Sequence, residues 1–446
     1  MSFEIDTQTI QDLGLFDENP QRQTIFSYFN KTKTFGGRVA LKRMMQNPLA
    51  ELNALKKRQN IIMFLRDHPF SPRINSGQMD FIDHYFRLNK SPLRSNAFDS
   101  FFSKYWVRQY ERNDLYLIQA GVENLVFLIQ EVEKWVNQAS IEGSDPSLRS
   151  IFSCFQDYLR LPEIKMMLQK IKEKPKSLRA HLYDRMFRVK YRKETEELIA
   201  SVYLVDAYRA VAETASLNKL GFPEYVDSAT PQIEMKGLFH PLLRDPVPND
   251  WALTGSKSLC FLTGPNMVGK STFLKSLGVS VYLAHLGFPV PARFMKTTVY
   301  NGLVTTINLA DHMDRGYSHF YSEVNRIKEV AQMINSRKRM FVIFDELFRG
   351  TNVKDAYDAS LLIIDAFAQI KQCSFCISTH ITEVAEKLLF HDRVLFKLFD
   401  VNIVNSVPFY TYKLQDGVSH ERLGMLIVKN EKIIELLAAS QGKPPE

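Results

Sequence analysis

Ten residues near the middle of the chain have the composition of a loop that binds phosphate. Residues 263–272 read TGPNMVGKST, so four residues separate Gly264 from Gly269, and Gly269 is followed by Lys270 and Ser271. Such a loop turns backbone N–H groups toward an anion, and the helix after it adds its positive end. Lys270 can reach the β- and γ-phosphates, and the Ser271 hydroxyl can coordinate Mg²⁺. The predicted nucleotide-binding residues are Gly264, Pro265, Asn266, Met267, Val268, Gly269, Lys270, Ser271 and Thr272.

Two acidic residues, Asp345 and Glu346, directly follow the apolar run 341–344. The run predicts a buried strand, and ligands of open α/β sheets bind beyond the carboxyl ends of such strands. We expect Asp345 to hold Mg²⁺ together with Ser271, and Glu346 to activate the attacking water as a general base. The alternative is a strand that ends in two solvated acids.

A third apolar run, 375–378, is followed by Thr379 and His380. At the end of a strand in this domain, His380 is expected to sense the γ-phosphate, and we count it with Glu346 and Lys270 as catalytic. The alternative is an ordinary surface histidine.

These residues require strands that deliver them to one edge of a sheet. After residues 222–231, short apolar runs are each followed by a turn and a helical pattern, which indicates an α/β domain with a largely parallel sheet. Before it, apolar residues recur at helical spacing, as at 118, 122, 125, 129 and 132. We therefore predict a helical domain over 1–231 and an α/β P-loop domain over 232–446.

The basic residues are unevenly distributed. The net charge is +8, and the segment 165–193 contains eleven Lys or Arg residues against two acids. This segment suits a polyanion such as the DNA backbone, although a solvated helical face is an equal alternative. The predicted DNA contacts are Lys174, Lys176, Arg179, Arg188 and Lys190.

The cysteines and the hydropathy of the chain favour a cytoplasmic protein. Cys373 and Cys376 form a CxxC inside an apolar run without a second pair, so we predict buried strand residues rather than a zinc or redox site. The first residues are polar and do not resemble a secretory signal. We find no stretch of roughly 18 apolar residues, and therefore expect no membrane segment.

Several of these motifs resemble those of the MutS family of DNA mismatch-repair ATPases. The segments 263–272, 345–351 and 378–380 are similar to its phosphate loop, its Mg²⁺ strand and its histidine switch. Residues 316–323 resemble the family signature helix, which implies that Ser318 approaches the γ-phosphate bound by the other subunit. Residues 412–424 resemble the C-terminal dimerisation segment, which implies that Tyr412 stacks on adenine.

The resemblance extends to residues before the phosphate loop, at 3–6, 34–38, 58–59 and 239–241, where it is weaker, and it has clear departures. The family usually has glycine where Val268 and Phe348 stand here. By this resemblance, we expect the chain to begin at the helical core and to lack an N-terminal mismatch-reading domain. The helical half is short for a full DNA clamp, so the basic segment is interpreted as a reduced lever tip.

The resemblance implies an ABC-like, Mg²⁺-dependent ATPase that works as a homodimer. ATP hydrolysis in composite sites would switch a helical clamp on duplex or branched DNA, in mismatch repair or a related recombination process, together with downstream repair proteins. An ATP-gated protein scaffold without DNA affinity is the alternative. A P-loop enzyme that transfers phosphate to a small molecule is a third reading, which Glu346 disfavours.

Overall fold

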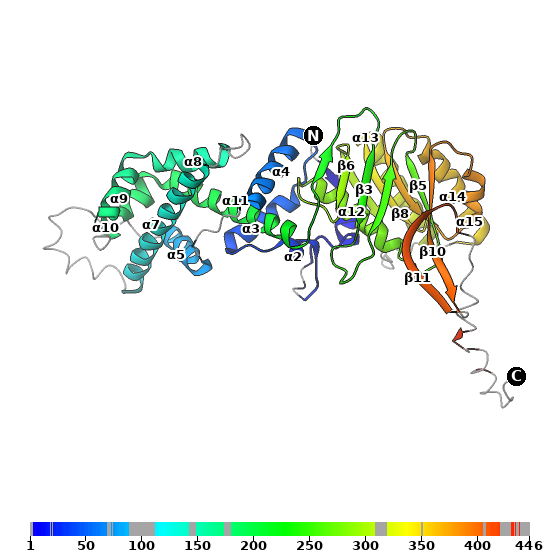
Figure 1. The fold of residues 1–446 in the computed structure, drawn as a ribbon, viewed down its shortest axis with the longest axis horizontal. Coiled ribbons are helices and arrows are strands. Elements are labelled where there is room, and N and C mark those ends of the chain that lie inside the picture. The colour runs from blue at the N-terminus through cyan, green and yellow to red at the C-terminus, as the bar shows by residue number, and fades with distance from the viewer. Residues whose placement is uncertain are drawn as a thin grey trace. The chain divides into compact units, whose positions relative to one another are not determined.

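The chain forms two compact units (Figure 1). A computed structural model describes residues 3–17, 19, 21–68, 73, 75–88, 112–141, 149–173, 180–307, 319–348, 351–404, 407–419, 430–431, 433 and 437. One unit consists of Met1–Tyr28, Asn47–Lys56 and Asn218–Glu446, and the other of Phe29–Gln46 and Lys57–Leu217. We call them the α/β unit and the helical unit.

The helical unit is built from amphipathic helices around one apolar core. Its longest helix, α7, buries Ile118, Val122, Leu125 and Ile129 completely, which is the stripe expected from the sequence. The helical first half is therefore confirmed. The helices with residues in this unit are α3 (Phe35–Gln46), α4 (Leu52–Asp67), α5 (Ser76–Arg87), α7 (Arg112–Ile141), α8 (Arg149–Leu159), α9 (Pro162–Glu173), α10 (Ala180–Arg185), a π-helical turn (Met186–Lys190) and α11 (Arg192–Leu217).

The hydropathy of α7 differs from what we expected. Among the described helices, its residues Asp114–Gln138 are long and apolar enough to cross a membrane by length and composition. The core helix of a soluble protein passes the same test, and the apolar stripe of α7 lies inside the helical unit. The apolar residues of this segment are interrupted by polar ones at helical spacing, so they form no continuous apolar stretch in the sequence.

The α/β unit contains a seven-stranded sheet in the order β1-β7-β8-β9-β5-β10-β11. All neighbours in this sheet are parallel except β10 and β11, so the predicted, mostly parallel sheet is confirmed. Its strands are β1 (Glu4–Ile5), β5 (Leu259–Thr263), β7 (Gly302–Thr306), β8 (Met340–Asp345), β9 (Ser374–Ser378), β10 (Val394–Val404) and β11 (Val407–Asp416).

A second sheet and several helices complete the α/β unit. The four-stranded sheet has the order β2-β6-β3-β4. Its strands are β2 (Pro223–Tyr225), β3 (Ile233–Leu238), β4 (Asn249–Leu253) and β6 (Phe294–Thr297). The helices are α1 (Thr7–Asp12), α2 (Ile25–Phe29), α12 (Lys270–Ala284), α13 (His319–Arg337), α14 (Val353–Ala368) and α15 (Thr382–Leu388).

The first residues of the chain belong to the α/β unit. Strand β1 pairs with β7, and the buried carboxylate of Asp12 accepts hydrogen bonds from Thr305 Oγ1 at 2.8 Å and Ile307 N at 2.9 Å. The units therefore do not coincide with our predicted boundary between residues 231 and 232. Helical periodicity in the sequence carries no sign of a two-residue strand whose partner lies about 300 residues away.

His285 predicts how the stability of the α/β unit depends on pH. The ring is fully buried, its Nδ1 donates to Val281 O at 2.8 Å, and its Nε2 accepts from Tyr300 N at 2.9 Å. Burial lowers the pKa of His285 from 6.5 to about 4. The unfolded chain thus takes up a proton as the pH falls below 6.5, whereas the folded chain does not until about pH 4. We expect stability to be full above this window and to fall within it, by on the order of 3 kcal/mol from this residue.

The measurement is denaturant unfolding of the α/β unit across that pH range. His285→Gln is the comparison, because it removes the titrating ring. It is expected to be less stable at neutral pH and to lose less on acidification. Equal losses in the two proteins would contradict the assignment. The pKa of His240 is also lowered to about 4, first by burial and then by the charge of Lys275. The stabilities of the wild type and of His285→Gln therefore both keep some dependence on pH from His240.

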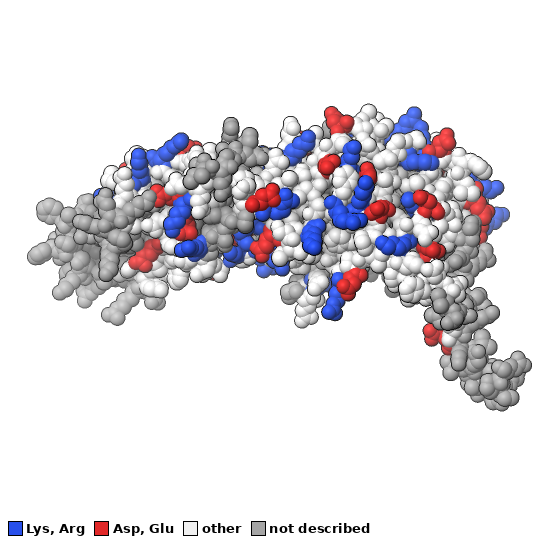
Figure 2. All heavy atoms as spheres, viewed as in Figure 1, with Lys and Arg blue, Asp and Glu red and all other residues white. Residues whose placement is uncertain are grey.

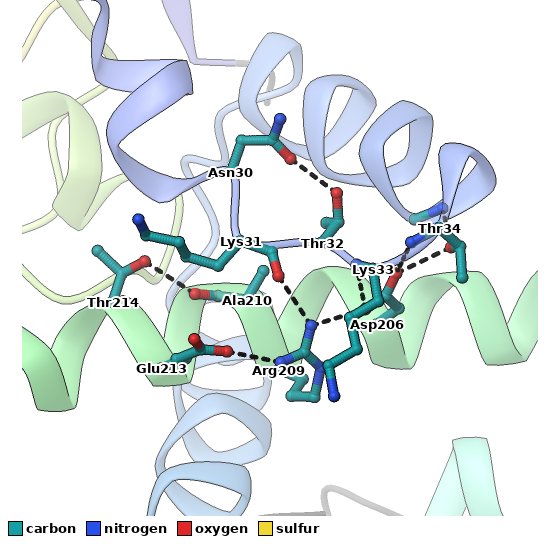
Figure 3. Close-up of polar contacts among 11 residues, drawn as sticks. Asn30, Lys31, Thr32, Lys33, Thr34, Asp206, Arg209, Ala210, Glu213 and Thr214 are labelled. Atoms are coloured by element: carbon teal, nitrogen blue, oxygen red, sulfur yellow. Dashed lines mark hydrogen bonds and ion pairs between the residues drawn. The ribbon is translucent and has the colours of Figure 1, made fainter. Parts of the chain in front are cut away.

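A polar cluster in the helical unit fixes the start of α3 to α11 (Figure 3). The Asp206 carboxylate accepts hydrogen bonds from Lys33 N at 3.0 Å, Thr34 N at 2.9 Å and Thr34 Oγ1 at 2.8 Å. Arg209 Nη2 donates to Asp206 at 3.0 Å and to Lys31 O at 2.8 Å. Both charged side chains are over 90% buried, so each depends on the other for compensation.

We expect Asp206→Ala to lower the free energy of unfolding of the helical unit by about 3–5 kcal/mol, because it leaves a buried guanidinium without its main countercharge. Urea unfolding followed by circular dichroism measures the loss. Glu213→Ala is the matched control, since Glu213 binds the same arginine but is 44% exposed. It should cost below about 1 kcal/mol. Similar losses for both variants would refute the role given to Asp206.

Candidate nucleotide site

The predicted phosphate loop lies between β5 and α12, as the motif requires. Strand β5 is buried throughout, and α12 begins at Lys270, after Gly269 in a left-handed conformation with φ of 98°. Gly264 has φ of 141°, and a Cβ there would lie 3.2 Å from Val268 Cγ2 and 3.3 Å from Phe399 O. The backbone conformation therefore favours glycine at position 264, and a side chain there would also pack tightly against these two residues.

Lys270 turns back over this loop. Its Nζ donates hydrogen bonds to Gly264 O at 2.7 Å and to Pro265 O at 3.0 Å, and the residue is only 5% exposed. The same ammonium lies 4.0 Å from Glu346 Oε1. A buried ammonium in this position is placed to exchange neutral carbonyl partners for an anionic phosphate.

The two predicted metal-binding residues are in direct contact. Ser271 Oγ donates to Asp345 Oδ2, and Asp345, the last residue of β8, is 7% exposed. A hydroxyl and a carboxylate are oxygen donors of the kind that Mg²⁺ prefers, and this ion commonly keeps water and substrate phosphates as its other ligands. Among the described residues, no group of three or more His, Cys, Asp or Glu is placed to hold a metal alone. The donor set therefore fits a Mg²⁺ ion bound together with a nucleotide.

Glu346, which directly follows β8, lies close to His380, which follows β9. Its carboxylate lies between two basic groups, because Oε2 is 3.9 Å from His380 Nδ1 and Oε1 is 4.0 Å from Lys270 Nζ. Its backbone is left-handed, with φ of 58°, and its N–H points at Ser378 O at 3.1 Å. The structure thus brings together the three residues predicted to be catalytic.

The other predicted nucleotide-binding residues surround the loop. Asn266 and Met267 are exposed, and Pro265 and Thr272 are half-buried. Tyr412, on β11, is partly exposed, and its Cδ1 lies 3.4 Å from where a Cβ on Gly269 would be. A ring beside the phosphate loop is compatible with the predicted adenine contact.

The side chains at both positions that depart from the family pattern are buried. Val268 is buried under the loop, next to Gly264. Phe348 has a left-handed backbone with φ of 61°, the conformation that glycine adopts without strain. Its ring is buried and lies 5.5 Å from that of Phe320 on α13. Phe348 thus combines an aromatic contact with Phe320 and a backbone conformation that is strained for any residue other than glycine.

The structure corrects one of the predicted DNA contacts. Arg188 lies in the π-helical turn and is 7% exposed, and its Nε and Nη2 donate to the fully buried Asp184 at 2.6 Å and 2.7 Å. Burial and a bidentate partner make it a core residue, which the count of basic residues could not reveal. Lys190 is exposed and forms an ion pair with Glu163. Lys174, Lys176, Arg179 and the predicted trans residue Ser318 lie outside the described residues.

The two cysteines of the CxxC sequence lie in or next to a buried strand. Cys373, directly before β9, and Cys376, within it, are both buried, and neither forms a disulfide. Burial raises the pKa of the Cys373 thiol, which makes it a poor nucleophile. The buried-strand interpretation is confirmed.

Comparison with known proteins identifies relatives of the α/β unit. The family model described as MutS domain V matches residues 260–441, a range that includes the phosphate loop, Asp345, Glu346 and His380. The DNA mismatch repair protein MutS of Petrotoga mobilis is 29% identical over 276 residues, which are 60% of this chain and 33% of that protein.

Two eukaryotic relatives match with similar identity. The MutS protein homolog 4 of Mus musculus is 28% identical over 51% of this chain and 24% of its own length. The DNA mismatch repair protein MSH3 of Phaeosphaeria nodorum is 26% identical over 72% of this chain and 29% of its own length. The matched part of the chain thus spans about a third, or less, of the length of these curated relatives.

Proposed function

Since the chain belongs to the MutS family, we propose that it is an ATPase, which binds ATP with Mg²⁺ and hydrolyses it to ADP and phosphate. The observation that carries the proposal is the convergence of Lys270, Ser271, Asp345 and Glu346 where β5 and β8 end. Their contacts join a phosphate loop, a metal-binding pair and a general base within one site.

Each residue has a separate role in this reaction. Lys270 leaves the carbonyls of its own loop and binds the β- and γ-phosphates, while the loop N–H groups bind the remaining oxygens. Ser271 and Asp345 hold the Mg²⁺ ion, which, when bound, neutralises charge on the phosphates. Glu346 accepts a proton from the attacking water, and its carboxylate is oriented by Lys270 and His380 on either side.

We further propose that the sites are composite and the protein is a homodimer. In this proposal, the α/β unit is the ATPase domain, with an ABC-like fold, and it pairs through its C-terminal segment. Ser318 is contributed in trans, and Tyr412 stacks on the adenine. The helical unit acts as a lever or clamp on duplex or branched DNA. Lys174, Lys176, Arg179 and Lys190 remain the proposed phosphate contacts. We also propose that the protein acts together with downstream repair proteins and is located in the cytoplasm.

One observation bears on DNA binding from the α/β unit itself. On the face shown in Figure 2, basic and acidic side chains are interspersed over this unit. Binding to a polyanion generally needs basic residues that are clustered. We assign the proposed DNA contacts to the helical unit, because the segment 165–193 contains eleven Lys or Arg residues against two acids.

The test is steady-state ATP turnover alone and with plain duplex, mismatched duplex or four-way-junction DNA. Low salt is used because phosphate contacts are then strongest. A change in turnover with DNA supports coupling between the two units, and the order of the DNAs shows whether a mismatch or a branched shape is sensed. If none of the DNAs changes the rate of ATP turnover, the proposal of a DNA clamp is rejected. The alternative, an ATP-gated protein scaffold without DNA affinity, is then favoured.

A further inference from the structure

The hydroxyl of Ser378 contacts both acidic residues of the proposed ATPase site. Ser378 is the last residue of β9, is fully buried, and is the register partner of Asp345 on β8. Its Oγ donates a hydrogen bond to Asp345 Oδ1. It also accepts one from the backbone N–H of Glu346 at 3.1 Å.

These two bonds fix the direction of the hydroxyl. A serine hydroxyl has one proton to donate, and the Glu346 N–H can only donate, so the proton of Ser378 is directed to the carboxylate. A hydrogen bond to a carboxylate is stronger than one between neutral groups, and burial strengthens it further. Ser378 therefore keeps one oxygen of Asp345 engaged and leaves Oδ2, the oxygen bonded to Ser271, to face the phosphate loop.

The same hydroxyl supports the unusual backbone of Glu346. The N–H of Glu346 is shared between Ser378 O and Ser378 Oγ, both at 3.1 Å. This residue has a left-handed backbone, which costs a non-glycine residue free energy and persists only where neighbouring contacts hold it. The orientation of the Glu346 carboxylate follows from that backbone, so the hydroxyl acts on the general base as well.

We propose that Ser378 is a positioning residue that sets the metal-binding face of Asp345 and the backbone of Glu346 at the same time. This inference rests on the proposed ATPase function. It assigns Ser378 no contact with nucleotide or metal. Removal of its hydroxyl frees Asp345 to rotate and weakens the hold on Glu346, so both metal binding and turnover should suffer while the phosphate loop is unchanged.

The experiment compares Ser378→Ala with Ser374→Ala. Ser374 is the matched control, because it is a buried serine on the same strand whose hydroxyl bonds to the hydroxyl of Tyr300 at 3.0 Å, away from the acids. The readout is binding of a fluorescent ATP analogue, titrated with Mg²⁺, which does not depend on turnover. We expect Ser378→Ala to need about 10-fold more Mg²⁺, as is typical when the partner of a metal ligand is lost, with unchanged nucleotide binding in EDTA. Ser374→Ala should titrate as the wild type does.

The outcomes separate this inference from the function on which it rests. If the wild-type protein binds no nucleotide with Mg²⁺, the proposed ATPase function fails. If it does, and the two serine variants need the same Mg²⁺ concentration, only the role of Ser378 fails. Ser378→Thr keeps the hydroxyl and should restore Mg²⁺ binding to near the wild-type level. A Ser378→Ala chain that does not fold beside a folded Ser374→Ala chain, or a threonine variant that folds without restoring Mg²⁺ binding, would also overturn the assignment.

Discussion

Glu346→Gln is expected to reduce ATP turnover by about 10²–10⁴-fold while the protein still binds ATP. The substitution keeps the shape of the side chain and removes the group that accepts the proton of the attacking water. The carboxylate also lies between Lys270 and His380, and the substitution leaves both of these side chains in the site. Single-turnover phosphate release and a nucleotide-binding titration measure the two quantities separately.

The matched control for this variant is Glu386→Gln, an exposed glutamate on α15 outside the site. It should turn over ATP at the wild-type rate. Residual activity of Glu346→Gln above about a tenth of the wild-type rate would mean that another group activates the water, since a general base contributes more than that.

Lys270→Ala should act on binding rather than on the chemical step alone. The ammonium is buried and aimed at the loop, where it is expected to form charge-assisted hydrogen bonds with the phosphates. Each such bond contributes about 1.5–3 kcal/mol, so we expect ATP affinity to fall by roughly 100-fold. Equilibrium titration with a fluorescent ATP analogue measures the change.

A second lysine on the same helix provides the comparison. Lys275 lies in α12, one turn beyond the loop, and is half-buried. Lys275→Ala should leave ATP affinity within about 2-fold of the wild type, because it removes no contact to the phosphate loop. If Lys270→Ala binds ATP as tightly as this control, the loop does not hold the phosphates in the way proposed.

Much of the site could be predicted from the sequence because its parts are local. The phosphate loop has fixed spacing, and each acidic or basic residue follows an apolar run that is a strand in the structure. Parallel strands place their carboxyl ends at one edge, so three separate segments could be assigned to one site. The same argument could not reach Ser378, since only the register of β8 and β9 shows that its hydroxyl meets Asp345.

What the sequence missed depends on contacts between distant residues. Arg188 was counted as a basic residue available to DNA, but Asp184, one helical turn earlier, is buried with it. The first residues were assigned to the helical domain, although Asp12 bonds to Thr305 in the sheet. Charge and periodicity are properties of a segment, whereas burial and partner choice arise only when the chain has folded.

In the proposed function, residues of the phosphate loop, Asp345 and Glu346 form a Mg²⁺-dependent ATP-hydrolysing site. The most direct measurement is phosphate release from ATP by the purified chain, with and without Mg²⁺, and with Glu346→Gln as the blank. We expect steady release that requires Mg²⁺, needs no added acceptor and disappears in the blank. Release that is absent from the wild-type protein, or equal in the wild type and the blank, would contradict it.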